Sequence, residues 1–168
     1  MHQIPSKKRG AKYKIKELEM KVLLTGSGGR EHALAWKLAQ SENLEKLYIA
    51  PGNPGTAMCG ENISIKDNDI DKLLAFAKEK NVDLLVVGPE EPLANGIVDR
   101  FEAAGIKAFG PSAAAAQLES DKAFSKHLMR AASVSTAEAK IFDSFVDAKK
   151  YIATRNDAVV VKAAGLAK

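Results

Sequence analysis

The chain has 168 residues, of which 46% are hydrophobic and 27% charged, a composition typical of a soluble globular protein. No apolar run approaches the roughly 20 residues that a membrane-spanning helix needs, so we expect no membrane partner. The single cysteine, Cys59, cannot form an internal disulfide, which favours a reduced, cytoplasmic setting.

The net charge of +4 is confined to the start of the chain. The first twenty residues hold six basic and two acidic side chains, and the charges of the remainder balance. Because the body has no basic surplus, we expect no nucleic-acid partner. Residues 1–19 are predicted to be a basic, disordered leader; a translation start at Met20 and a basic arm for nucleic acid or a protein partner are the alternatives.

After Met20 the sequence alternates between buried strands and helices. The elements predicted up to Phe109 are strands over residues 21–25, 47–49, 62–65, 83–88 and 106–109, and helices over residues 31–40, 69–80 and 93–104. Parallel neighbours in a sheet need long crossover connections, and helices of this length supply them. The sequence therefore predicts an α/β fold with a doubly wound parallel sheet.

A different pattern follows. Residues 112–130 are predicted to form two helices that separate near Asp121, which can cap the second. Beyond Val134 come a strand over residues 139–142, a helix over 144–154 and a strand over 158–162. Little sequence remains to pair with or cover the last strand, so we expect an unfinished element. Trp36 and the alanines at 113–116 are predicted to be packing residues.

The glycine-rich turn Gly26-Ser27-Gly28-Gly29-Arg30-Glu31 carries the first chemical signal. It ends a strand and opens a helix, where free backbone N–H groups and the helix dipole favour a phosphate. The dinucleotide fingerprint requires a third glycine where Glu31 stands, and residues 48–51 supply no acid for a ribose. A monophosphate with Arg30 as its charged partner fits better; the alternative is that the glycines only permit a tight turn.

Two further loops follow the ends of strands, where ligands of open α/β sheets bind. Glu90 and Glu91 follow a buried strand and either accept hydrogen bonds from sugar hydroxyls or complement a helix dipole. Asn53 and Thr56 either bind the same ligand or shape their loop.

Two lysines occupy positions that an anionic ligand would explain. Lys162 ends an apolar strand, where an unpaired charge is costly, and Lys122 begins a helix, where an acid would be favoured. No residue is identified as catalytic.

Six strings of the sequence, in this order, resemble the phosphoribosylamine–glycine ligases, which are also called glycinamide ribonucleotide synthetases. They are residues 28–34, 50–57, 87–93, 109–112, 121–124 and 160–167. The resemblance covers Met20 to Lys168. It implies an ATP-grasp enzyme of purine biosynthesis that uses Mg²⁺ and ATP to phosphorylate glycine, whose acyl phosphate the amine of 5-phosphoribosylamine then attacks. Glycinamide ribonucleotide, ADP and phosphate are the products.

The resemblance also implies an organisation and a set of site residues. Residues 20–120 would be a Rossmann-like pre-ATP-grasp domain, and residues 121–168 a linker helix with an incomplete ATP-grasp domain. The residues implied to bind phosphoribosylamine are Gly28, Gly29, Arg30, Glu31, Asn53, Thr56 and Glu90. Those implied to bind ATP are Lys122, Lys162 and Gly165.

Two departures from the family pattern matter. Ala164 stands where many members have aspartate or serine. The family also continues with a glycine-rich lid, metal-binding carboxylates and a carboxyl-terminal domain, so we expect this chain to be the first two-fifths of such an enzyme. We expect it to be inactive alone, and the full-length form to be a monomer. The alternatives are another ATP-grasp ligase or a stand-alone sugar-phosphate-binding module.

Overall fold

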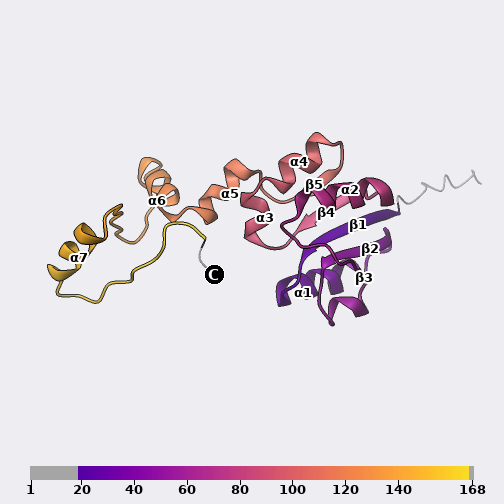
Figure 1. The fold of residues 1–168 in the computed structure, drawn as a ribbon, viewed down its shortest axis with the longest axis horizontal. Coiled ribbons are helices and arrows are strands. Elements are labelled where there is room, and N and C mark those ends of the chain that lie inside the picture. The colour runs from indigo at the N-terminus through magenta and orange to yellow at the C-terminus, as the bar shows by residue number, and fades with distance from the viewer. Residues whose placement is uncertain (1–18, 167–168) are drawn as a thin grey trace, which may run out of the picture.

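The computed structural model describes residues 19–166, and its main feature is a five-stranded parallel sheet of order β3-β2-β1-β4-β5 (Figure 1). The strands are β1 (Met20–Gly26), β2 (Leu44–Pro51), β3 (Glu61–Asn62), β4 (Leu84–Val87) and β5 (Lys107–Phe109). The central strand is β1, in which Leu24 lies beside Ile49 of β2 and Val86 of β4. The α/β prediction is confirmed. Residues 1–18 of the leader predicted over residues 1–19 lie outside the described part.

The helices around the sheet are α1 (Gly29–Leu38), η1 (Thr56–Met58), α2 (Ile70–Lys80), α3 (Glu90–Ala94), α4 (Ile97–Ala103) and α5 (Ala113–Ser120). The chain moves from β1 to β2 in one direction and from β3 to β4 and β5 in the other. Because such crossovers are right-handed, α1 lies on one face of the sheet, and α2 and α4 lie on the other.

Two hydrophobic clusters, one on each face, match this arrangement. Ala35 of α1 packs with Leu24 and Val86 on one face. On the other face, Leu73 of α2 and Phe101 of α4 pack into a larger cluster. Successive residues of β1 point to opposite faces, so a strand buried on both sides appears in the sequence as a continuous apolar run.

Local capping explains where several elements begin and end. The Oδ1 atom of Asp69 accepts the Lys72 N–H at the start of α2. The Asp121 carboxylate accepts the N–H groups of Ala123 and Phe124 in the first turn of α6 (Lys122–Ala131), which confirms the predicted separation of two helices. The single helix predicted over residues 93–104 is two helices, α3 and α4, and the first of them begins earlier, at Glu90. Gly96 adopts a left-handed conformation (φ +79°) that ends α3 and sets the direction of α4.

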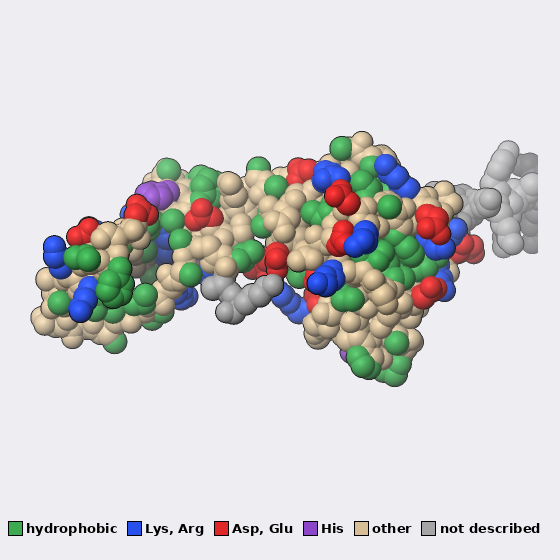
Figure 2. Space-filling model, in the orientation of Figure 1, with side chains coloured by type: hydrophobic (Ala, Val, Ile, Leu, Met, Phe, Trp, Pro, Cys, Tyr) green, Lys and Arg blue, Asp and Glu red, His purple; other side chains and the backbone are tan. Residues whose placement is uncertain are grey.

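The part of the chain after α5 extends away from the sheet (Figure 1). It contains α6 and α7 (Phe145–Ala153), which confirms the helix predicted over residues 144–154, and Ser144 caps α7. The strands predicted over residues 139–142 and 158–162 are wrong: both segments are irregular. A strand forms only when another strand accepts its hydrogen bonds, and none does so among the described residues. Hydrophobic side chains therefore lie on the surface around α7 (Figure 2). Val160 is 82% exposed.

Two smaller predictions are corrected. Trp36 is 60% exposed on α1 and is not a packing residue, although Ala116 of the alanine stretch is buried. The strand predicted over residues 62–65 is limited to the two residues of β3. No helix among residues 19–166 is long and apolar enough to cross a bilayer.

The packing of α4 on the sheet can be tested with two phenylalanines. Phe101 is fully buried, so Phe101→Ala is expected to lower the free energy of unfolding by about 3–5 kcal/mol. Phe109 is 70% exposed, so Phe109→Ala should change it by less than about 0.5 kcal/mol. Urea unfolding followed by circular dichroism measures both, and equal losses would contradict the arrangement.

Candidate functional site

Three loops meet at the carboxyl edge of the sheet, where β1, β2 and β4 end. The Gly52 N–H of the β2 loop donates to the Gly26 oxygen at 3.1 Å, and the Gly88 N–H of the β4 loop donates to the Thr25 oxygen at 3.2 Å. Both neighbouring loops are therefore attached to the end of the central strand. This edge is where open α/β sheets bind ligands.

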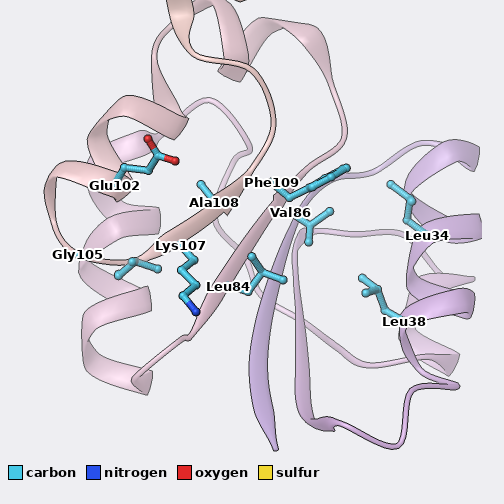
Figure 3. A pocket seen from close by; sticks show the side chains of 10 residues that line it. Leu34, Leu38, Leu84, Val86, Glu102, Gly105, Lys107, Ala108 and Phe109 are labelled. Carbon is cyan, nitrogen blue, oxygen red and sulfur yellow. The ribbon is translucent and has the colours of Figure 1, made fainter. Parts of the chain in front are cut away.

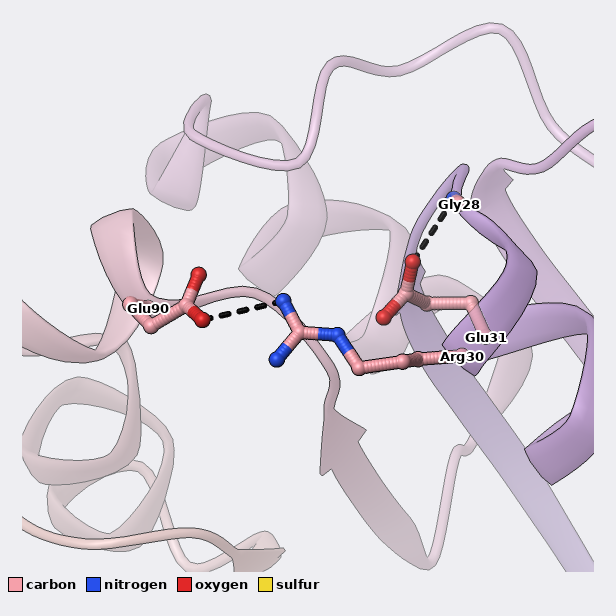
Figure 4. A network of polar contacts seen from close by, with 4 residues as sticks. All are labelled: Gly28, Arg30, Glu31 and Glu90. Atoms are coloured by element: carbon pink, nitrogen blue, oxygen red, sulfur yellow. Dashed lines mark hydrogen bonds and ion pairs between the residues drawn. The ribbon is translucent and has the colours of Figure 1, made fainter. Parts of the chain in front are cut away.

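The Glu31 side chain fills the space between two of these loops. It is 4% exposed, and its Oε2 atom accepts the Gly28 N–H at 2.6 Å (Figure 4). A Cβ atom at Gly26 would lie 2.5 Å from Glu31 Cγ, and one at Gly88 would lie 2.3 Å from Glu31 Oε1. A side chain at either position would therefore displace this carboxyl group from its place. From its residues alone the sequence had indicated that Glu31 breaks the dinucleotide fingerprint, and the resemblance had implied that Glu31 binds phosphoribosylamine, which stays a prediction.

The N-terminus of α1 remains open on its outer side. The Gly28 N–H donates to Glu31. The N–H groups of Gly29 and Arg30 lie in the first turn of α1, where the helix itself provides no carbonyl oxygen to accept them. Gly28 and Gly29 are exposed, and a Cβ atom at Gly29 would meet nothing within 4 Å. Backbone donors and the positive end of the helix dipole therefore face open space, an arrangement suited to an anion.

An ion pair crosses from this turn to the β4 loop. Arg30 Nη2 donates to Glu90 Oε1 at 2.9 Å, and the two side chains are 70% and 32% exposed (Figure 4). Glu90 has a pKa below its ordinary value, first because its carboxylate accepts its own backbone N–H at the start of α3, and second because of Arg30. Glu90 in turn raises the pKa of Arg30. Both groups are charged at neutral pH.

Asn53 connects the β2 loop to the glycine turn. Its Nδ2 atom donates to the Ser27 oxygen at 2.9 Å and the Gly28 oxygen at 3.2 Å. Its Oδ1 atom accepts the N–H groups of Gly55 at 2.7 Å and Thr56 at 3.0 Å. The amide is fully used in holding the two loops together.

Thr56 acts from inside the same loop. It is fully buried, and its hydroxyl accepts the Asn53 N–H at 2.7 Å. Asn62 Nδ2 also donates to the Asn53 oxygen, at 2.8 Å. These contacts give Asn53 and Thr56 a role in shaping the loop, and their direct contact with a ligand stays a prediction.

The residues predicted to bind ATP lie in the part of the chain that extends from the sheet. Lys122 Nζ donates to the Gly165 oxygen at 3.0 Å, and the Lys122 N–H donates to the Ala164 oxygen at 2.7 Å. The start of α6 and the Ala164–Gly165 turn are therefore in contact. Lys162 is exposed. Within residues 19–166, no three His, Cys, Asp or Glu side chains gather as a metal site would require.

The structure thus divides the predicted residues into two groups. Residues 28–31 are linked to Asn53, Thr56 and Glu90 by the contacts described above. Lys122 and Gly165 are in contact separately, in the extended part of the chain.

Two family models match adjacent segments of the chain. The model described as phosphoribosylglycinamide synthetase, N domain, matches residues 20–119. The model described as phosphoribosylglycinamide synthetase, ATP-grasp (A) domain, matches residues 120–168.

Curated relatives carry a consistent name. The phosphoribosylamine–glycine ligase of Brucella melitensis is 55% identical over 148 residues, and that of Escherichia coli strain K12 is 50% identical over 150 residues. Each match covers 88% of this chain but 35% of the relative. The chain therefore spans about a third of the length of these relatives.

Solved structures show the same fold. The phosphoribosylamine–glycine ligase from Thermotoga maritima superposes with a TM-score of 0.65 at 28% identity, over 87% of this chain and 33% of that one. The biotin carboxylase domain of the Hydrogenobacter thermophilus 2-oxoglutarate carboxylase gives a TM-score of 0.63 at 19% identity, over 80% of this chain and 32% of that one. The second likeness shows the fold alone.

The position of Glu31 predicts how two glycines respond to substitution. Gly88→Ala places a methyl group against the Glu31 carboxyl, so we expect a loss of about 1–3 kcal/mol in the free energy of unfolding. Gly29→Ala is the matched control because its methyl group meets open space, and it should change stability by less than about 0.5 kcal/mol. Urea denaturation measures both.

A double variant identifies the group responsible. If the methyl group collides with Glu31, then Glu31→Ala combined with Gly88→Ala should be less destabilised than the sum of the single changes. Simple additivity would mean that Gly88 is required for another reason.

The titration of Glu90 can be followed by carboxyl ¹³C NMR. The midpoint should lie below about 4.3, the ordinary glutamate value. It should rise in Arg30→Gln without reaching that value, since the backbone N–H still binds the carboxylate. Because the folded pKa is the lower one, this stabilisation is present above the ordinary pKa and is lost as the pH falls through the folded value. An unchanged midpoint in Arg30→Gln would contradict the ion pair.

Proposed function

The chain belongs to the phosphoribosylglycinamide synthetase family, and from that premise we propose that it supplies the phosphoribosylamine-binding part of an ATP-dependent carbon–nitrogen ligase of purine biosynthesis. The proposed reaction joins glycine to 5-phosphoribosylamine and yields glycinamide ribonucleotide, ADP and phosphate. In this proposal residues 20–120 form the substrate domain, and residues 121–168 form a linker helix with the beginning of the ATP-grasp domain.

One observation carries the proposal: an exposed Arg30–Glu90 pair borders the open N-terminus of α1. The Gly29 and Arg30 N–H groups and the Arg30 guanidinium favour an anion on one side, while the Glu90 carboxylate favours hydrogen-bond donors on the other. Phosphoribosylamine offers both, because its phosphate is anionic and its hydroxyl and amine groups donate. A guanidinium has five donors, so Arg30 can bind a phosphate and still contact Glu90.

The remaining residues of the site hold these groups in place. Glu31 fixes the glycine turn against the β4 loop, and Asn53 with Thr56 fixes the β2 loop against the same turn. Loops held in this way keep their donors oriented before the ligand arrives, which reduces the entropy lost on binding.

The ATP site is proposed at the contact between α6 and the Ala164–Gly165 turn. Lys122 contacts a backbone oxygen there and, among the described residues, forms no ion pair, so its charge is available to a phosphate. A Cβ atom at Gly165 would meet open space, and Lys162 is exposed three residues before it. ATP supplies the phosphoryl group that makes the glycine carboxylate a good electrophile.

The donor set of the described residues does not fit a metal ion, so we draw no step through Mg²⁺. We propose that its ligands lie in the region that the relatives carry beyond the matched third. We further propose a cytoplasmic location, which the free Cys59 supports, and a monomeric full-length enzyme.

Calorimetric titration with ribose 5-phosphate tests the phosphate site. We expect saturable binding by the 168-residue chain, no binding of ribose, and an affinity roughly tenfold or more lower for Arg30→Gln, because a charged hydrogen bond contributes about 1.5–3 kcal/mol. The matched control is Arg100→Gln, since Arg100 also forms an exposed ion pair, with Asp71, away from the glycine turn.

Two outcomes of this titration would contradict the proposal. Equal losses in the two arginine variants would remove Arg30 from the site. Absence of binding to a folded sample would overturn the proposal for this domain.

A further inference from the structure

One face of the sheet is only half covered. Right-handed crossovers place α2 and α4 on one face and α1 alone on the other, where it packs over β1 and β2. Beside α1, above β4 and β5, lies a hollow of about 750 Å³. Parallel sheets are normally covered by helices on both faces, so this hollow lies where a second helix would pack.

The hollow is lined mainly by carbon atoms. Leu34 and Leu38 of α1 face Leu84, Val86 and Phe109 of the two strands across it (Figure 3). The exposed fraction of Phe109 there is large for an aromatic side chain. The charged side chains in the lining are Glu102 and Lys107. A site for a small polar ligand needs several converging polar groups, so the lining favours a polypeptide.

The length of the relatives indicates which polypeptide this is. The chain matches 35% of the ligases from Brucella melitensis and Escherichia coli, so two-thirds of each relative lies outside the match. We propose that the hollow is the docking surface for an apolar helix from that carboxyl-terminal two-thirds. The helix would lie beside α1, roughly 8–10 Å from its axis, and would complete the second face of the sheet. The inference rests on family membership and not on the ligand site.

Thiol labelling tests this surface directly. In a Cys59→Ser background, cysteine is introduced at Phe109, which lines the hollow, or at Trp36, which is similarly exposed on α1 but does not line it. Each variant is labelled in the 168-residue chain and in a chimera that joins this chain to the remaining two-thirds of the Escherichia coli K12 ligase. We expect Phe109→Cys to react at least tenfold more slowly in the chimera and Trp36→Cys to react equally fast in both.

Three other outcomes overturn the proposal. One is equal reactivity of Phe109→Cys in the two proteins. Another is equal slowing at both positions. The third is a labelling rate of Phe109→Cys that falls as the concentration of the 168-residue chain rises, which would assign the surface to a second copy.

If the chimera does not fold, the same labelling is carried out at the matching positions of the full-length Escherichia coli ligase. Unhindered labelling at the position that matches Phe109 then overturns the proposal. Ribose 5-phosphate binding is measured separately, so failure of either proposal can be distinguished.

Discussion

The arrangement of the site depends on one buried carboxyl group. Glu31 reaches back from the first turn of α1 to the Gly28 N–H and lies against the backbone of Gly26 and Gly88. A charged or polar group is buried at a net cost unless hydrogen bonds compensate it, and Oε1 has no partner among the described residues. Such a group is retained where it fixes a geometry. Here it fixes the distance between the β1 and β4 loops.

This constraint separates residues that support the site from residues that face a ligand. Glu31, Asn53 and Thr56 use polar atoms within the loops, whereas the Arg30 guanidinium and the Glu90 carboxylate form an ion pair at the opening. The proposed phosphate donors are backbone N–H groups of the helix start, beside the Gly28 N–H that Glu31 accepts. A hydrogen-bonded inner layer and an exposed charged pair would let the proposed site bind an anion without rearranging its loops.

The sequence predicted the sheet well because its evidence is local. A strand buried on both faces appears as an apolar run, and β1 and β4 are such runs. The strands predicted over residues 139–142 and 158–162 failed since a strand also needs a partner, which no local pattern reveals. The role of Glu31 was missed for a similar reason. Its contact with Gly88 joins residues 57 positions apart in the chain, and the sequence offered only the absence of a third glycine and a resemblance that implied a ligand contact.

Topology explains why the two faces of the sheet differ. The order β3-β2-β1-β4-β5 requires two connections toward β3 and two toward β5. A common handedness places the first two, with α1 and the short η1, on one face and the last two, with α2 and α4, on the other. The uncovered area above β4 and β5 is thus a consequence of strand order and not of the side chains that the strands carry. Apolar residues at Val86 and Phe109 are consistent with a sheet whose second face is completed from elsewhere, because permanent exposure of such a surface would favour aggregation.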